Sequence, residues 1–224
     1  MVKRLAILMV GIVAAVAVPV TAAYALGIQE RKQEQRDRSR KEMQLGDEAL
    51  TAKDFDAAID HYTKVLDSKV CGTDCGKYYF RRGLAWQGKQ DCTKAVADYE
   101  EAGKTLTDNG ELYFNASLCY NQLNQPDKAL AALDQAIKIN PESTNYRVGR
   151  CIALFNKHNF AGALPDCEYT LGSAPDDQKM LFATAMSAEQ TGDKAKAAKY
   201  YSHLLKLDPG NQQAKDGLAR TGGG

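Results

Sequence analysis

The sequence predicts an all-α protein, a right-handed solenoid of five helix-turn-helix hairpins followed by a short capping helix. Three observations predict it. Five alanines recur at a nearly constant interval, a small residue stands twelve positions before each, and a larger residue or Cys stands four positions after each. An interval of about 34 residues is typical of stacked helical hairpins. The alanines are Ala58, Ala95, Ala129, Ala163 and Ala197.

Residues 1–25 have the pattern of a secretory signal peptide. Lys3 and Arg4 give a positive start, and an uncharged run follows from Leu5 to Val20. Ala23 and Ala25 then supply the small residues that a signal peptidase reads. The sequence therefore favours an exported protein, with a bacterial periplasm as the expected compartment.

An uncleaved membrane anchor is the alternative. Leu5 to Gly27 would span about 35 Å as a helix, which is enough to cross a bilayer. The Ala- and Val-rich composition favours cleavage, and the basic residues that follow disfavour an anchor with this flank outside the cytoplasm. Both alternatives place the remaining chain outside the cytoplasm, and the anchored form would sit at the inner membrane.

Residues 26–38 are expected to form a charged polar linker. Residues 29–42 contain no apolar side chain, so a helix here would have no packing face. The alternative is a basic segment that binds a membrane surface or a partner.

The hairpins are indicated by the residues at which the helices of each repeat begin and end. Asp54, Asp91, Asn159 and Asp193 stand where second helices begin, and such side chains cap helix N-termini. Prolines near the end of the last three repeats close their second helices, because the residue before Pro avoids the α region. The predicted repeats are 39–72, 76–109, 110–143, 144–177 and 178–211, and residues 212–224 are expected to be a capping helix with a disordered Gly tail.

The recurring positions of these repeats resemble the tetratricopeptide-repeat family over residues 39–211. The period, the small and aromatic positions and the prolines match the pattern of that family. The departure is a three-residue insertion near Gly72 to Cys75, in a repeat without a closing Pro. The resemblance implies a concave groove, lined by the first helix of each hairpin, in which a partner peptide lies.

The groove positions implied by the resemblance are mostly apolar. The Lys, Asn and Arg residues of the family's carboxylate clamp, which holds chaperone tails, are absent from them. A long exposed apolar strip indicates a binding site; the alternative is that these side chains pack between repeats. The occupant could be a partner, a second copy or the chain's own N-terminus. The predicted partner-binding residues are Phe80, Leu84, Phe114, Leu118, Asn121, Val148, Ile152, Phe155, Phe182 and Met186.

The six cysteines suit three disulfides in an exported chain. The repeat geometry pairs Cys151 with Cys167 inside one hairpin and Cys92 with Cys119 between neighbouring helices. Cys71 and Cys75 then remain in the inserted loop. Free buried thiols, or a redox or metal role for Cys71 and Cys75, are the alternatives.

The predicted function is that of a protein-binding scaffold or adaptor of the cell envelope. A holdase or co-chaperone for exported clients is the alternative, and a thiol-disulfide oxidoreductase using Cys71 and Cys75 is a third. No spacing indicates catalytic residues, a cofactor or a metal site. The net charge of +1 does not favour a nucleic-acid partner.

Overall fold

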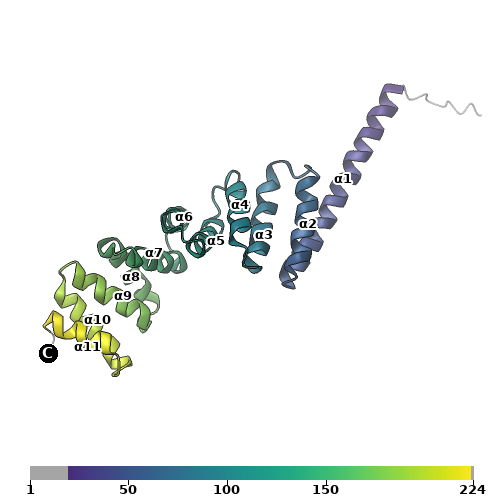
Figure 1. Cartoon of the computed structure of the whole chain (residues 1–224). Coiled ribbons are helices and arrows are strands. Elements are labelled where there is room, and N and C mark those ends of the chain that lie inside the picture. The colour runs from purple at the N-terminus through teal and green to yellow at the C-terminus, as the bar shows by residue number, and fades with distance from the viewer. Residues whose placement is uncertain (1–19, 223–224) are drawn as a thin grey trace, which may run out of the picture.

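The computed structural model describes residues 20–222 as a row of antiparallel helical hairpins (Figure 1). This part of the chain contains eleven α-helices, one 3-10 helix (η1, Gly72–Asp74) and no strand, and the predicted all-α solenoid is confirmed. The hairpins are α1 (Val20–Thr51) with α2 (Phe55–Asp67), α3 (Cys75–Gly88) with α4 (Cys92–Gly103), α5 (Gly110–Gln122) with α6 (Pro126–Ile139), α7 (Thr144–Asn156) with α8 (Phe160–Ser173), and α9 (Gln178–Gln190) with α10 (Lys194–Leu207); α11 (Gln212–Thr221) follows.

The turns inside the hairpins share one geometry. The predicted capping residues Asp54, Asp91, Asn159 and Asp193 each accept a hydrogen bond from the backbone N–H three residues later, at 3.0–3.1 Å. The residue before each of these four caps, and the residue before Gln125 at the start of α6, has a left-handed backbone, which ends the preceding helix. These residues are Lys53, Gln90, Asn124, His158 and Gly192.

The ends of the last three hairpins are set by proline. Asn140, Ala174 and Asp208 precede prolines and have φ near −130° with ψ between 72° and 89°, so each helix stops there. In the first two repeats, where Pro is absent, Ser68 and Lys104 remain in the α region at the helix end. The connections to α3 and α5 are correspondingly less regular.

The core of each hairpin is a close contact between two recurring positions, the small residue of the first helix and the larger residue of the second helix. A Cβ added to Gly83 would lie 2.6 Å from the ring of Tyr99, and one added to Gly46 would lie 2.8 Å from the ring of Tyr62. Both rings are fully buried. Because the first helix carries no side chain at these points, the two helices approach each other across the tyrosine ring.

The segment predicted as a linker is helical. Residues 26–38 belong to α1, which runs without a break from Val20 into the first hairpin and extends beyond the row of hairpins (Figure 1). Residues 29–38 are exposed throughout, as expected for a segment without an apolar face. Near the end of this segment, Gln35 Nε2 donates to Ser68 O at 2.9 Å and the hydroxyls of Ser39 and Ser68 lie 3.0 Å apart.

The predicted signal peptide, residues 1–25, lies mostly outside the described residues. Ala23 and Ala25 fall within α1. Among residues 20–222, no helix combines the length and the apolar character needed to cross a membrane.

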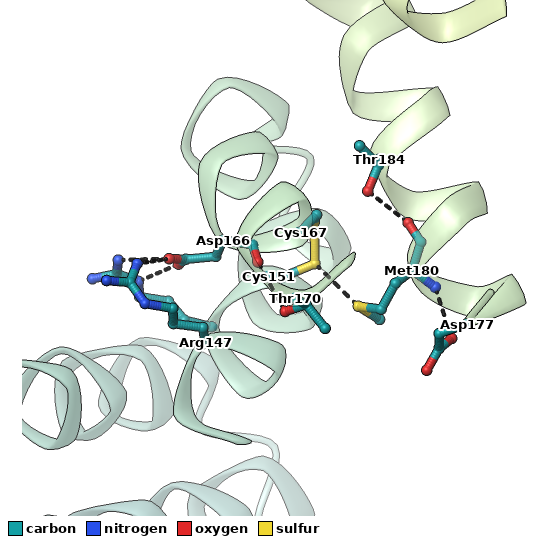
Figure 2. Close-up of a disulfide and its surroundings, with 9 residues drawn as sticks. Arg147, Cys151, Asp166, Cys167, Thr170, Asp177, Met180 and Thr184 are labelled. Atoms are coloured by element: carbon teal, nitrogen blue, oxygen red, sulfur yellow. Dashed lines mark hydrogen bonds and ion pairs between the residues drawn. A yellow bond between two sulfur atoms is a disulfide. The ribbon is translucent and has the colours of Figure 1, made fainter. Parts of the chain in front are cut away.

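Three disulfides join the pairs expected from the repeat geometry. Cys151 and Cys167 link α7 to α8 with 5.2 Å between their Cα atoms, and Met180 Sδ of α9 lies 3.8 Å from Cys151 Sγ (Figure 2). Cys92–Cys119 links α4 to α5, and Cys71–Cys75 closes a ring around η1. The first two disulfides are buried in the core.

Two hairpins contain a buried Arg–Asp pair. Both carboxylate oxygens of Asp98 accept from Arg82 at 2.8 Å, and Asp98 is 5% exposed. Asp166, 1% exposed, accepts from Arg150 at 2.6 Å and from Arg147 at 2.9 Å (Figure 2). The carboxylate of Asp166 raises the pKa of Arg150 further above its usual value. Such pairs are costly to break, because the remaining partner is left buried and charged.

We expect Gly83→Ala to lower the free energy of unfolding by about 1–3 kcal/mol, because the new methyl group overlaps the Tyr99 ring. Gly172→Ala is the matched control, since a Cβ added there meets no atom within 4 Å. That change should be neutral or stabilising by up to about 1 kcal/mol through helix propensity. Urea unfolding followed by circular dichroism at 222 nm measures both. Equal effects of the two substitutions would contradict the tyrosine contact as the determinant of helix approach.

We expect Cys151→Ser to lower the melting temperature under oxidising conditions, because the lost cross-link closes a loop worth about 3 kcal/mol in the chain-entropy model. The difference from the unaltered chain should shrink when a reductant opens all the disulfides. The double change Cys71→Ser/Cys75→Ser is the control and should cost less, about 2 kcal/mol, because its loop is shorter. Melting that does not respond to reductant would count against the cross-links.

Candidate functional site: the face of the first helices

The first helices of successive hairpins lie beside one another along one face of the solenoid. Contacts join α1 to α3, α3 to α5, α7 to α9 and α9 to α11 without an intervening second helix. All ten predicted groove residues lie on α3, α5, α7 and α9. The site is therefore a surface shared by several repeats and not a pocket within one of them.

Three of the predicted groove residues are exposed. Leu118 of α5 and Ile152 of α7 are 43% and 42% exposed, so they are two of the few large apolar side chains of residues 20–222 that face water. Asn121, one turn after Leu118, is also exposed. The uncovered part of the face thus lies over the third and fourth repeats.

The other predicted groove residues are partly buried in contacts with neighbouring helices. The Phe80 ring lies 6.0 Å from the ring of Tyr99, and the Phe114 ring lies 5.2 Å from that of Tyr146. The structure thus gives these positions a packing role as well, and the apolar surface is narrower than a continuous strip over four repeats. The remaining half-buried positions are Leu84, Val148, Phe155, Phe182 and Met186.

The first repeat ends this face with polar contacts. Asp47 accepts from the Tyr62 hydroxyl at 2.7 Å and pairs with Arg81. Burial and the Asp47 carboxylate together raise the pKa of Tyr62, so its hydroxyl stays protonated and donates. Tyr78 donates to Met43 Sδ at 3.2 Å. These groups are engaged with each other.

The last repeat also ends this face with polar contacts. Glu189 accepts from the Tyr201 hydroxyl at 2.8 Å and from Arg220 of α11 at 2.6 and 3.0 Å. The Arg220 guanidinium lowers the pKa of Glu189, and burial is the main cause that raises the pKa of Tyr201. The carboxylate is therefore held ionised and fixes α11 against α9.

Two hollows flank Ile152 between these polar ends. The first, which we call the α7–α11 hollow, has a volume of about 510 Å³ and the second, the α5–α7 hollow, about 490 Å³. The α7–α11 hollow is lined by Ile152, Phe155, Gln178, Lys179, Met180, Phe182, Ala183, Asn211 and Gln213. The α5–α7 hollow is lined by Asn121, Asn124, Pro126, Ile152, Ala153, Asn156 and Lys157.

The chemistry of the hollows suits a polypeptide segment. Ile152, with Phe155 and Phe182, offers apolar surface at the centre. Side-chain amides on both sides can donate to and accept from a peptide backbone. Lys157 is paired with Asp127, whereas Lys179 in the α7–α11 hollow forms no ion pair within residues 20–222. The arrangement therefore favours apolar side chains together with backbone hydrogen bonds.

The amide-bearing residues were not among the predicted site residues. Gln178, Asn211 and Gln213 lie in the first turns of α9 and α11 or just before them, whereas the predicted positions are farther along each helix. They line the α7–α11 hollow together with Ile152. The sequence does contain a signal for them, since α9 begins with Gln178 and α11 begins after Asn211 with Gln212 and Gln213.

The structure also bears on the alternatives for the cysteines. Cys71 and Cys75 are partly exposed and joined to each other at the start of α3, away from both hollows. Within residues 20–222, no group of three or more His, Cys, Asp or Glu side chains is placed to hold a metal ion.

Comparison with known proteins places these features in a family. Tetratricopeptide-repeat profiles match residues 43–105, 110–143 and 149–212. The wheat (Triticum aestivum) Hsp70-Hsp90 organizing protein is 33% identical over 93 residues, which cover 42% of this chain and 16% of that protein. The chain spans less than two thirds of the length of the curated relatives that it matches.

Solved structures agree in fold. YrrB, described as a tetratricopeptide-repeat protein with an unusual peptide-binding site, superposes with a TM-score of 0.69 at 18% identity, covering 84% of this chain and 95% of that one. MamA superposes with a TM-score of 0.68 at 23% identity, covering 79% and 95%. Profiles of a protein-interaction repeat support a protein-binding scaffold and point to no catalytic family. The chain belongs to the tetratricopeptide-repeat family.

Proposed function

We propose that this protein is an exported scaffold or adaptor that holds a segment of a partner protein against α5, α7, α9 and α11. The observation that carries the proposal is the exposed Ile152 between two hollows of about 510 and 490 Å³. A large aliphatic side chain left in water beside concave surface favours an apolar occupant.

The occupant that suits this face is an amphipathic or extended segment with few charges. Its apolar side chains would cover Ile152 and Leu118 and enter the hollows, and its backbone would meet the amides of Asn121, Gln178 and Asn211. Both modes occur in peptide recognition by helical grooves. The YrrB structure, a peptide-binding protein by its description, supports a peptide as the class of ligand.

The compartment is proposed from the N-terminal sequence. Residues 5–19 are uncharged, and Ala23 and Ala25 lie in one helix with the rest of α1. The small residues Ala23 and Ala25 after this run support cleavage, and the alternative is that residues 5–27 are retained as an anchor. In that case the exposed helix of residues 26–38 would hold the repeats about 20 Å from the surface of a bacterial inner membrane. A cell-envelope assembly is the partner we propose.

A holdase for exported clients would use the same apolar face. The two functions differ in the number of partners and in affinity. A scaffold binds one partner stoichiometrically, whereas a holdase binds many unfolded chains weakly.

We expect Ile152→Ser to weaken capture of the partner at least about tenfold, because exposed apolar anchors at the centre of an interface typically contribute about 2 kcal/mol or more. The melting temperature should hardly change, since surface substitutions usually alter stability by about 0.5 kcal/mol or less. The measurement is crosslinking and quantitative pull-down from native envelope, with thermal unfolding of the same preparations.

Leu207→Ser is the matched control, since Leu207 is an aliphatic residue of similar exposure, 39%, at the end of the second helix α10. It should leave capture unchanged. A lowered melting temperature with capture intact would show that Ile152 serves packing, and many weakly bound clients in place of one partner would favour the holdase.

The location is tested with reporters fused after residue 45. We expect a reporter that works only outside the cytoplasm to be active, because an uncharged run after a basic start directs export. Activity of a reporter that requires the cytoplasm would contradict the proposal. Alkaline carbonate extraction of the full chain then separates a retained anchor, which stays with the membrane, from a released protein.

A further inference from the structure

A third hollow, which we call the α4–α6 hollow, lies away from the face just described. Its volume is about 510 Å³, and it opens between the second helices α4 and α6, with α5 as its floor. None of the predicted groove residues lines it. Its lining residues are Tyr99, Glu100, Gly103, Lys104, Leu112, Tyr113, Ala116, Tyr120, Lys128, Ala131, Ala132 and Gln135.

The register of the repeats explains why the hollow is present here. Ala116 stands one full repeat after Arg82 and one full repeat before Arg150. Ala132 stands one full repeat after Asp98 and one full repeat before Asp166. In the second and fourth repeats these positions hold the buried Arg–Asp pair, with contacts of 2.6–3.1 Å. The third repeat has a methyl group at both positions. The hollow therefore occupies the place of a missing ion pair.

The fifth repeat fills the same place differently. Tyr200, one full repeat after Asp166, stands at the Asp position and is partly buried, with its hydroxyl 3.4 Å from Glu168. A large aromatic side chain is thus compatible with this position of the repeat. Only the third of these four repeats has alanine at this position, and Ala116 and Ala132 line the hollow although they are only 5% and 8% exposed.

The walls of the hollow are aromatic and its rim carries one cation without an acidic partner. Tyr120 donates to Glu100 at 2.8 Å, and Lys104 pairs with Glu101 at 2.6 Å. Lys128 lies 5.4 Å from the centre of the Tyr120 ring and forms no ion pair with any residue of the described chain. Glu101 is thus neutralised by Lys104, whereas Glu100 keeps its negative charge while it accepts from Tyr120, so the rim carries one cation, Lys128, and one anion, Glu100.

We propose that the α4–α6 hollow is a second binding site, which takes a large aromatic or aliphatic side chain of a partner polypeptide with a carboxylate beside it. The side chain would enter the hollow beside Ala132, where the Arg–Asp pair is absent, and pack on the half-buried ring of Tyr113. The carboxylate would pair with Lys128. This site does not depend on the face around Ile152, and either proposal can fail without the other.

The probe is the fluorescein-labelled peptide Gly-Asp-Phe-Gly with an amidated end, titrated into the full chain and followed by anisotropy. Replacing Phe by Ala in the peptide should weaken binding about tenfold, because the anchor side chain is lost. Replacing Asp by Asn should weaken it about two- to fivefold, the size of a rim ion pair. A carbodiimide should join the peptide carboxylate to Lys128, as read by mass spectrometry.

Variants of the protein distinguish binding at this site from nonspecific binding of the peptide. The double change A116R/A132D installs the ion pair of the neighbouring repeats, and it should abolish binding while the chain stays helical. Ala132→Leu fills the hollow without new charge and should weaken binding about tenfold if the double variant does not fold. Lys128→Gln should act like the Asn peptide, whereas Lys138→Gln, on the exposed side of the same helix, should change nothing.

Three outcomes would overturn the proposal. The first is no saturable binding of the peptide to the folded chain, and the second is equal binding of the Phe and Ala peptides. The third is a crosslink at Lys128 between two copies of the chain that the peptide does not displace, which would assign the hollow to self-association. Loss of binding in A116R/A132D and Ala132→Leu, with Lys138→Gln unaffected, is the result expected.

Discussion

The contact on which the rest of the structure depends is the one between a small residue of the first helix and a larger side chain of the second. Gly83 opposite Tyr99 is the clearest case, since a Cβ at Gly83 would reach to within 2.6 Å of the ring. The contact sets how closely the two helices of a hairpin approach. Because each hairpin then has nearly the same thickness, successive hairpins stack regularly and first helices meet along one face.

The residue at the tyrosine position of the second helix also determines where that face is open. Tyrosines in the first, second and fifth repeats donate to Asp47, Gln87 and Glu189 on the first helices. In the third and fourth repeats the tyrosine position holds Leu133 and Cys167, which have no hydroxyl to donate. Asn121 and Phe155 stand one and two repeats after Gln87, and both line the hollows beside Ile152. Asn121 is exposed there and can contact a partner, whereas Phe155 packs against the rings of Phe160 and Phe182 and exposes only part of its side chain.

The sequence predicts most of the fold because its determinants are local. The N-terminal caps and closing prolines act within a few residues, and the columns repeat often enough to be read without a structure. The site is less predictable. Whether Phe80 or Phe114 is exposed depends on Tyr99 and Tyr146, each in a different helix. The α4–α6 hollow arises from two alanines that individually suit a helix, and only the comparison with Arg82 and Asp98 one repeat earlier makes them informative. Residues 26–38 form a helix without any packing face, so apolar periodicity alone gives no sign of it.

The two open regions coincide with departures of the chain from its own repeat, and each lies beside a disulfide. The third and fourth repeats lack the tyrosine ring that packs the other hairpins, and Cys151–Cys167 joins the two columns directly in the fourth. The α4–α6 hollow has α5 as its floor, and Cys92–Cys119 joins α4 to that helix. A hollow costs the contacts that its lining side chains lose, and a cross-link offsets such a loss by restricting the unfolded chain. In a solenoid, where each hairpin is held only by its neighbours, a weak junction would otherwise separate the two ends of the protein. The disulfides therefore make it possible to leave side chains and space uncommitted at the repeats where binding is proposed.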